Sequence, residues 1–409
     1  DAHACISVVT RKEMEQMHMN TVEEALRTAP GVQFLNYGQN GMNGNLSGIR
    51  LNGSKDIIIL VDGVRVTDFQ DVGSSGYVYS FLLNNMDNIE RIEVLRGAAG
   101  TVYGSGAKGG VINIITRKIN NASAVVDAAR GRFGKQVYHV NTQGRKGKFS
   151  YNAYYNADKR GDYQDGEGRR WPGHTDTKSD GVKLAYDLTP DHTVTFQYDW
   201  MDSKYSGQDL IYIGPYNGRY KSRMWSLTDD WKVDDHWRNK LTYRNNRLET
   251  RYGKPLGEGN SQGTVSAPYS VSSDMNYDFL SNQVEFTDAR NTLVFGVDYS
   301  KARSLDGQHP MGFDEDGDAI YGDRSMKNHS YYIQDDWKLS PAITLSGGLR
   351  HDKPNGDGSS PNMDSHTSKS YKLSFDLTKK DTFYAGRSDF YILPSLYQLY
   401  DEKYGNADL

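Results

Sequence analysis

Three carboxylates at alternate positions, Asp314, Asp316 and Asp318, surround a glycine and could bind a hard cation. Oxygen ligands at this spacing suit calcium. The glutamate that usually completes a twelve-residue calcium loop is missing, however. Calcium binding and a solvated acidic segment therefore both stay open, and the solvated segment is favoured. A second and weaker candidate set for calcium consists of Asp162, Asp165 and Glu167.

A glycine-rich segment at residues 104–109 matches the spacing of a dinucleotide-binding fingerprint. Such a fingerprint should follow a strand and open a helix, but this segment leads directly into the apolar β run Gly110–Ile115. No Lys-Ser or Lys-Thr pair follows the glycines, so a phosphate-binding loop is not indicated either. Tight turns packed against a wall of strands account for these glycines better.

The other reactive side chains form no convergent catalytic group. The ten histidines show no H-E-x-x-H or comparable metal spacing, and no nucleophile–base pair or carboxylate pair stands out. The single cysteine, Cys5, excludes a framework of disulfides within the chain. An enzyme or a soluble carbohydrate-binding β protein is therefore an alternative class without an identified site.

Composition leaves two classes of β protein open. The mean hydropathy is −0.74, and no run of roughly 18 apolar residues occurs, so a transmembrane helix is excluded. Membrane β-strands alternate lipid-facing and lumen-facing residues, which keeps their mean hydropathy low. The 29 Tyr and six Trp suit membrane interfaces, although a soluble all-β protein can also be rich in tyrosine. A net charge of −4 with scattered Lys and Arg does not indicate nucleic acid.

The first part of the chain, residues 1–121, has the pattern of a mixed α/β domain. A helix should begin after Thr21, which has a glutamate at the third position after it, and end at Ala29 before Pro30. Four strands are predicted, at Ser7–Thr10, Ile57–Val61, Ile89–Leu95 and Val111–Thr116.

From about residue 122 the pattern changes to alternating segments of about ten residues, with about 13 candidate strands. Examples lie at 149–155, 182–188, 193–200, 293–300, 330–339, 343–350 and 371–377. Short turns alternate with long polar stretches at 159–180, 203–222, 253–276, 305–325 and 353–369. Short periplasmic turns and long extracellular loops on one side are typical of an outer-membrane barrel, whereas a soluble sandwich does not predict this alternation.

The N-terminal motifs resemble the plug domain of TonB-dependent outer-membrane receptors. The matching stretches are Thr21–Val32, Ile49–Gly53, Ile59–Val64, Ile89–Gly97, Val102–Gly104 and Gly109–Thr116. Ala98 stands where the family usually has proline, which is a local change in a loop. The resemblance implies an α/β plug at residues 1–121 in the lumen of an antiparallel membrane barrel formed by residues 122–409.

Two pairs of motifs in the second region resemble barrel segments of the same receptors. They are Tyr331–Leu339 with Leu345–Arg350, and Ile392–Tyr400 with Gly405–Leu409. In the family the second pair lies well before the C-terminus of a barrel of 22 strands. The resemblance therefore implies that the barrel is truncated here. We also expect the chain to begin within a mature protein, after the segment that contacts TonB.

The resemblance implies energised uptake across the outer membrane, with the barrel exterior against outer-membrane lipid. A scarce metal chelate would bind the outer loops and the plug apex, and TonB with its inner-membrane energising complex would displace the plug. No cofactor is required. An iron–siderophore complex is the first expectation, followed by cobalamin and then haem. No histidine lies between Ile392 and Leu409, which disfavours haem, although His174, His309 and His366 keep it open.

Two stretches of the plug, 36–43 and 68–79, are rich in glycine, amide and aromatic groups. The candidate ligand-binding residues there are Tyr37, Met42, Phe69, Tyr77 and Tyr79. These groups could hold a bulky chelate, although unliganded surface loops would have the same composition.

Two plug arginines, Arg50 and Arg96, lie in motifs that the resemblance places at the plug–barrel interface. We expect each to pair with a barrel carboxylate, because the planar guanidinium binds carboxylates in a bidentate manner. Ordinary arginines on the plug surface are the alternative.

Overall fold

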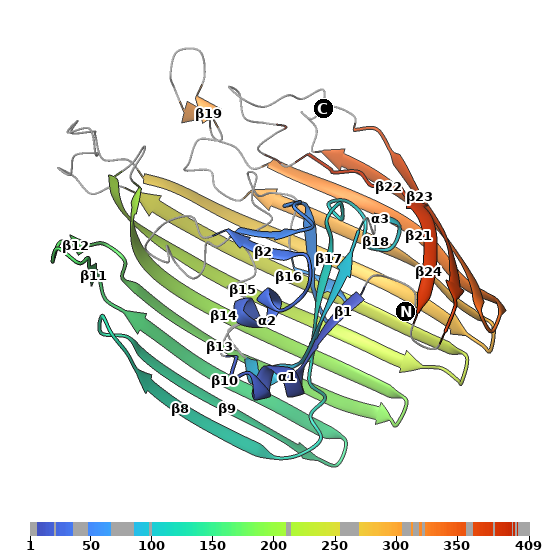
Figure 1. The fold of residues 1–409 in the computed structure, drawn as a ribbon, viewed down its shortest axis with the longest axis horizontal. Coiled ribbons are helices and arrows are strands. Elements are labelled where there is room, and N and C mark those ends of the chain that lie inside the picture. The colour runs from blue at the N-terminus through green and yellow to red at the C-terminus, as the bar shows by residue number, and fades with distance from the viewer. Residues whose placement is uncertain are drawn as a thin grey trace.

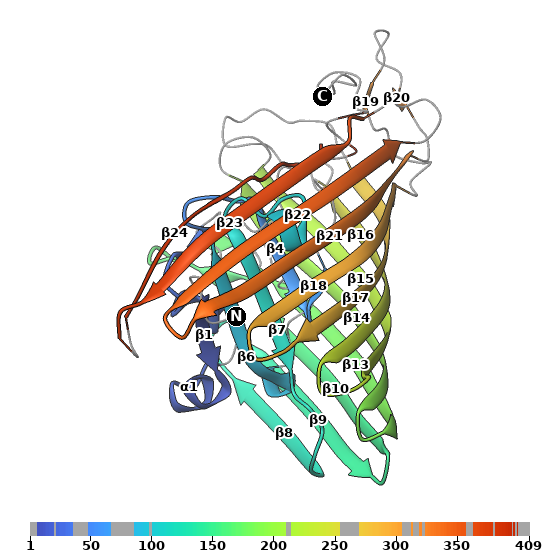
Figure 2. The ribbon, with the colours of Figure 1, turned by 90° about the vertical axis from the view of Figure 1, so that its right-hand side faces the viewer.

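In the computed structural model, a curved wall of long strands surrounds a small α/β unit on its concave side (Figures 1 and 2). The structure describes residues 6–19, 22–35, 48–66, 86–97, 100–209, 214–253, 270–304, 312–313, 319–320, 324–356, 363–378, 381–394, 396 and 399. None of the described helices is long and apolar enough to cross a membrane.

The α/β unit, here called the plug, is built on a five-stranded sheet in the order β1-β6-β7-β4-β5. The strands are β1 (Ile6–Thr10), β4 (Ile57–Val61), β5 (Val64–Arg65), β6 (Ile89–Arg96) and β7 (Gly110–Thr116). A separate pair joins β2 (Val32–Leu35) to β3 (Gly48–Leu51). The helices are α1 (Arg11–Gln16), α2 (Val22–Arg27), α3 (Gly100–Tyr103) and the 3-10 turn η2 (Met86–Asn88). The four predicted plug strands are confirmed to within one residue at each end.

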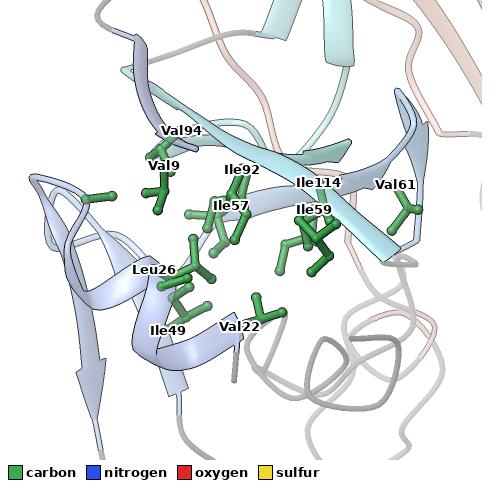
Figure 3. Close-up of a cluster of buried hydrophobic side chains, with 14 of the residues drawn as sticks. Val9, Val22, Leu26, Ile49, Ile57, Ile59, Val61, Ile92, Val94 and Ile114 are labelled. Carbon is green, nitrogen blue, oxygen red and sulfur yellow. The ribbon is translucent and has the colours of Figure 1, made fainter. Parts of the chain in front are cut away.

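Two hydrophobic clusters stabilise the plug, and the larger one also includes Met224 of the wall. Leu26 of α2 packs with Ile57 and Ile59 of β4 and with Ile92 of β6, each at most 1% exposed (Figure 3). All five residues of β4 are buried, as expected for an apolar run in the interior of a sheet that is covered on both faces.

One helix of the plug was not predicted, and the predicted helix ends earlier than expected. A complete capping box joins Thr10 and Glu13 at the start of α1, where the Glu13 carboxylate accepts from the Thr10 N–H at 2.7 Å. The predicted helix is present as α2, but it ends at Arg27 rather than Ala29, because Thr28 and Ala29 form tighter bonds to Ala25 and Leu26. The predicted capping residue Thr21 lies outside the described residues.

The wall is one sheet of 13 antiparallel strands in which consecutive strands along the chain are neighbours in space, from β8 to β24. The strands are β8 (Ser123–Arg130), β9 (Gln136–Lys146), β10 (Phe149–Arg160), β13 (Thr175–Thr189), β14 (His192–Asp209), β15 (Gly214–Lys232), β16 (Trp237–Gly253), β17 (Ser270–Thr287), β18 (Asn291–Ser304), β21 (Arg324–Ser340), β22 (Ile343–Gly356), β23 (His366–Asp376) and β24 (Thr382–Ser388). The predicted pattern of about 13 alternating strands is therefore confirmed.

The two faces of the wall differ in polarity. On β22 every second residue is buried toward the plug, while Leu345 and Leu349 are exposed on the convex face. Exposed aromatic residues gather near the short turns, as in the contact of Trp237 with Phe286 at 4.8 Å between ring centroids. Apolar side chains outward and aromatic residues near the strand ends are what a membrane-facing surface requires.

The strands extend farther on the long-loop side than predicted. The expected loop at 203–222 is wrong, because β14 continues to Asp209 and β15 starts at Gly214. Polar cross-strand contacts extend the pairing there, such as the 2.7 Å bond from Arg219 Nε to Asp202. Two short hairpins lie within predicted loops. They are β11 (Tyr163–Gln164) with β12 (Arg170–Trp171), and β19 (Gly312–Phe313) with β20 (Ala319–Ile320).

Candidate functional site

The predicted ligand-contacting residues of the plug lie outside the described residues. They are Tyr37, Met42, Phe69, Tyr77 and Tyr79, and the same is true of the acidic set Asp314, Asp316 and Asp318. Their roles stay predictions.

The weaker calcium candidate belongs to the β11–β12 hairpin, where the protein already supplies donors to its carboxylates. Asp165 accepts from Trp171 Nε1 at 2.9 Å and from Arg169 Nε at 2.7 Å. These bonds hold the pKa of Asp165 well below its usual range. Asp162 likewise accepts from Arg170 and from the backbone of residues 173 and 174. Over the described ranges, no group of three His, Cys, Asp or Glu could hold a metal ion.

The two plug arginines take different positions. Arg50 Nη1 donates to the carbonyl of Gly53 at 3.3 Å. Arg96 is half-buried, lines the space between the plug and the wall, and has a buried Nε without a hydrogen-bond partner. Neither arginine forms an ion pair with an acid in the part of the wall that the structure describes. The predicted pairing with barrel carboxylates therefore stays a prediction.

The plug contacts the wall first at the hairpin that joins β4 to β5. Lys240 donates to the carbonyl of Asp62, and Arg244 Nη1 donates to the carbonyl of Val64 at 2.9 Å. Lys183 lies 3.6 Å from the Asp62 carboxylate. We call Lys183, Lys240 and Arg244 the basic clasp.

Strand alternation explains how the basic clasp forms. Lys240 and Arg244 are four residues apart on β16, so both point to the concave face, and Lys183 of β13 points the same way. The turn that they contact has positive φ at Asp62 (53°) and Gly63 (80°). In this conformation its carbonyl groups face the cations of the wall. Charge-assisted bonds of this kind are stronger than neutral ones.

The Asp62 side chain is also held by hydrogen bonds within the plug. Its carboxylate accepts from the Thr116 N–H at 2.8 Å and from the Thr116 hydroxyl at 2.6 Å. Burial alone would raise the pKa of Asp62, but the charge of Lys183 and the Thr116 bonds outweigh it, so the pKa is lowered.

The second contact is made by residues 101–106, which overlap the glycine-rich segment 104–109 and which we call the glycine loop. Gly104 has a φ of +79°, and a Cβ there would lie 3.0 Å from Arg350 Nε, so both the backbone conformation and the close approach favour glycine. Thr101 and Ser370 share a hydrogen bond of 3.0 Å, and Ser105 Oγ accepts from the Leu393 N–H at 2.7 Å. The prediction of tight turns against a wall of strands is confirmed.

Arg350, which faces the glycine loop, is held by the wall itself. It donates to Asp298 and to Asp352 at 3.0 Å each, and its side chain is 5% exposed. Asp352 is fully buried and also accepts from Ser330 at 2.6 Å and Asn328 at 2.9 Å. All side chains of this network point to the concave face of the wall. The network therefore holds the Arg350 guanidinium in a fixed position toward the plug.

A cavity of about 660 Å³, lined by both polar and apolar residues, lies between the two contacts. Its plug side includes Glu93, Arg96 and Asn113, and its wall side includes Lys240 and Thr242 near the basic clasp and Ser370 near the glycine loop. Further polar residues that line it are Gln283, Glu285, Gln334, Asp336, Lys372 and Arg387. Hydrogen bonds to water can replace these polar contacts at a small net free energy. The wall contributes Met224 to the larger hydrophobic cluster of the plug, so most of that core stays covered when the contacts break.

Sequence reasoning missed the basic clasp and the Arg350 network. Arg350 lies in a motif with family resemblance, but its role as a glycine-loop contact depends on pairing with a segment about 250 residues earlier. The sequence offers no signal for the clasp beyond cations at concave-face positions, which many strands share.

Two family models match the chain. One, described as the TonB-dependent receptor plug domain, matches residues 1–111. The other, described as the TonB-dependent receptor-like β-barrel, matches residues 121–409.

Curated relatives are similar along most of this chain. An iron-regulated outer membrane virulence protein of Vibrio cholerae is 29% identical over 380 residues, which cover 89% of this chain and 54% of the relative. The probable TonB-dependent siderophore receptor PirA of Acinetobacter baumannii is 27% identical, with 96% and 58% covered. The vitamin B12 transporter BtuB of V. cholerae is 25% identical, with 99% and 62% covered. The chain thus spans little more than half the length of these relatives.

Solved structures show the same fold. The siderophore receptor PirA from A. baumannii superposes with a TM-score of 0.74 at 22% identity, over 97% of this chain and 62% of that one. The ferric yersiniabactin uptake receptor FyuA from Yersinia pestis gives 0.74 at 18% identity, over 94% and 64%.

Proposed function

The chain belongs to the TonB-dependent receptors of the outer membrane, and on this premise we propose that it serves energy-coupled uptake of an iron–siderophore complex. The family is one of transport receptors, so the enzyme and the soluble carbohydrate-binding alternatives lose their support. Relatives named as iron-regulated protein and siderophore receptor favour an iron chelate as the ligand. Cobalamin is the second candidate, because a vitamin B12 transporter is similar over 99% of the chain.

The observation that carries the proposal is that two polar contacts, on either side of a cavity, hold the plug against the strand wall. A plug that must be displaced and then reseated needs contacts that water can replace. The basic clasp and the glycine loop satisfy this requirement, because their plug partners are mainly backbone carbonyls, hydroxyls and glycine backbone.

The order of strands in the plug suggests where TonB would act. β1, the first described strand, lies at one edge of the sheet and pairs only with β6. The β4–β5 hairpin, which the basic clasp holds, forms the opposite edge. A pull on the N-terminus would therefore separate β1 from β6 before it loads the clasp.

For the ligand site we propose the plug apex, with Tyr37, Met42, Phe69, Tyr77 and Tyr79 in contact with the chelate. Aromatic and thioether groups would cover the chelate, and hydroxyl groups would orient it. Tyr77→Ala with Tyr79→Ala should weaken chelate binding by about tenfold or more, if each ring contributes about 1 kcal/mol. Tyr186→Ala, on the convex face of β13, is the control in the same titration. Unchanged affinity in the double variant would place the site in the outer loops alone.

The acidic set Asp314, Asp316 and Asp318 is proposed as a solvated outer loop, with calcium as the alternative. Equal chelate affinity with calcium and with a calcium chelator supports the solvated loop. A loss of affinity on calcium removal, absent in Asp316→Asn, supports the metal.

Uptake by the complete receptor tests the function. In cells that lack their own iron receptors, the complete receptor should accumulate iron from a ferric siderophore only when TonB is present. Ferric catecholate, ferric hydroxamate, cobalamin and haem are compared in parallel. Uptake of cobalamin alone would favour the second candidate, and uptake that does not require TonB would contradict the mechanism.

A further inference from the structure

An apolar groove of about 410 Å³ crosses the convex face of the wall between β17 and β23. Short side chains, Val284 and Val297, alternate there with the longer Phe295, Tyr331 and Leu349. Tyr331 is 56% exposed, and Val297 and Leu349 are nearly half exposed. The groove therefore opens toward the surroundings of the barrel and is separate from the cavity beside the plug.

Cationic side chains continue from the groove toward the long-loop end of the wall. Val297, Tyr331 and His351 form one cross-strand row of the groove. The next outward row holds His329 beside Lys353, and the row after that holds Lys301 opposite Lys327. Each row lies about 7 Å farther along the strands, because outward residues alternate. We call Lys301, Lys327 and Lys353 the lysine cluster.

Few acids accompany the lysine cluster among the described outward residues of the neighbouring strands. Like charges placed directly opposite each other on neighbouring strands, as in Lys301 and Lys327, are destabilising. The outward positions described on β18, β21, β22 and β23 contain one acid, Asp335, which lies near the short turns.

The acid nearest to the cluster in the strand register is already engaged. Asp278 of β17 stands opposite Lys301, but it accepts from Tyr243 at 2.7 Å, Asn245 at 2.8 Å and Arg303 at 3.0 Å. Among the described outward residues, the cluster therefore forms a positively charged patch next to an apolar groove.

We propose that the groove and the lysine cluster together bind one lipid of the outer leaflet that carries phosphate groups and several acyl chains. In an outer-membrane barrel the long loops face outward, so the cluster lies at the level of the outer headgroups and the groove at the level of the acyl chains. Phosphates meet the lysines, and an acyl chain fills the groove beside Val297 and Leu349. This inference requires the barrel family alone and not the identity of the transported chelate.

Native mass spectrometry of the complete receptor in non-ionic detergent tests the site. The probes are bisphosphorylated lipid A and the same lipid without its phosphates. Lys301→Gln, Lys327→Gln and Lys353→Gln combined should weaken binding of the phosphorylated lipid by about tenfold or more, since a cation near a lipid surface contributes about 1 kcal/mol. The dephosphorylated lipid should bind the native receptor about as weakly as the phosphorylated lipid binds this variant.

A matched control removes three outward cations elsewhere at the same end of the wall, on strands that do not line this groove. Lys178→Gln, Lys204→Gln and Lys221→Gln, on β13, β14 and β15, change the net charge equally and should alter binding less than twofold. Leu349→Trp, which fills the groove, should weaken binding while the lysines stay in place. An equal loss in both triple variants, or full binding by Leu349→Trp, would overturn the site. Circular dichroism and chelate binding verify that each variant is folded.

Discussion

The plug and the wall bury opposite kinds of side chain. The buried side chains of the plug are mostly aliphatic, among them Leu26, Ile59 and Ile112. The buried side chains of the wall that face the plug are mostly polar, such as Asn152, Ser203 and Thr242. The plug is therefore stabilised mainly by its own core, whereas the wall surface that faces the plug is mostly hydrophilic. A domain with an independent core and a polar seat can be displaced without losing its fold.

The largest effect should come from the plug core. Ile112→Ala, at a fully buried position of β7, should destabilise the plug by about 2–5 kcal/mol, because it removes buried methyl groups and leaves a cavity. Faster hydrogen exchange in β6 and β7 measures this loss. Leu345→Ala on the convex face of the wall, where the side chain is 40% exposed, is the control and should leave plug exchange unchanged. Equal effects of the two variants would contradict an independent plug core.

The basic clasp should contribute less than the core. Arg244→Met keeps the bulk of the side chain but removes the donors to the Val64 and Val61 carbonyls. The cost should be about 1–3 kcal/mol, the usual range for a hydrogen bond to a charged group. It should appear as faster exchange in β4 and β5 and as leakage of a large antibiotic through the complete receptor.

The control for the clasp is Arg223→Met, which removes an exposed outward cation from neighbouring β15. It should not change leakage. If Arg244→Met leaves both exchange and leakage unchanged, the plug does not depend on this contact.

The glycine loop should show a smaller effect that two variants can separate. Gly104 and Gly53 have nearly the same positive φ, 79° and 78°. A Cβ at Gly53 meets nothing within 4 Å, whereas at Gly104 it meets the Arg350 guanidinium at 3.0 Å. Gly53→Ala should therefore cost about 1 kcal/mol from backbone conformation alone.

Gly104→Ala should lower the stability of the plug by the same amount from backbone conformation. It should lower it further because the new Cβ displaces Arg350 from the plug. Proteolysis of the glycine loop and exchange in α3 measure the difference between the two variants. Identical effects would mean that Arg350 does not hold the loop.

Features that depend on local sequence could be predicted, whereas the side-chain contacts observed between the plug and the wall could not. Sequence patterns that span only a few residues predicted the strand Ile57–Val61, whose bounds match β4. They also predicted the alternating strands of the wall. The expected loop at 203–222 was wrong, because polar strands extended by cross-strand ion pairs look like loops in sequence. The basic clasp could not be predicted, because it joins β4–β5 to a strand about 180 residues away. The plug-apex residues and the pairing of Arg50 and Arg96 with barrel acids stay predictions.

The smallest effect should be the pH dependence of the Asp62 contact. The pKa of Asp62 is lowered in the folded protein, so its carboxylate stabilises the seated plug above the unfolded pKa of about 3.9. That contribution should fall as the pH drops from about 3.9 through the folded pKa, where protonation removes the attraction to Lys183. Because the Asp62 side chain is 31% exposed, solvent screening should keep the change below about 1 kcal/mol.

Asp62→Asn retains an acceptor for the Thr116 N–H but has no charge to titrate. In hydrogen exchange of β4 and β5, the difference between the native and the variant receptor should therefore be largest at neutral pH and become smaller as the pH falls toward 3. A constant difference across that range would mean that the Asp62 charge does not help to seat the plug.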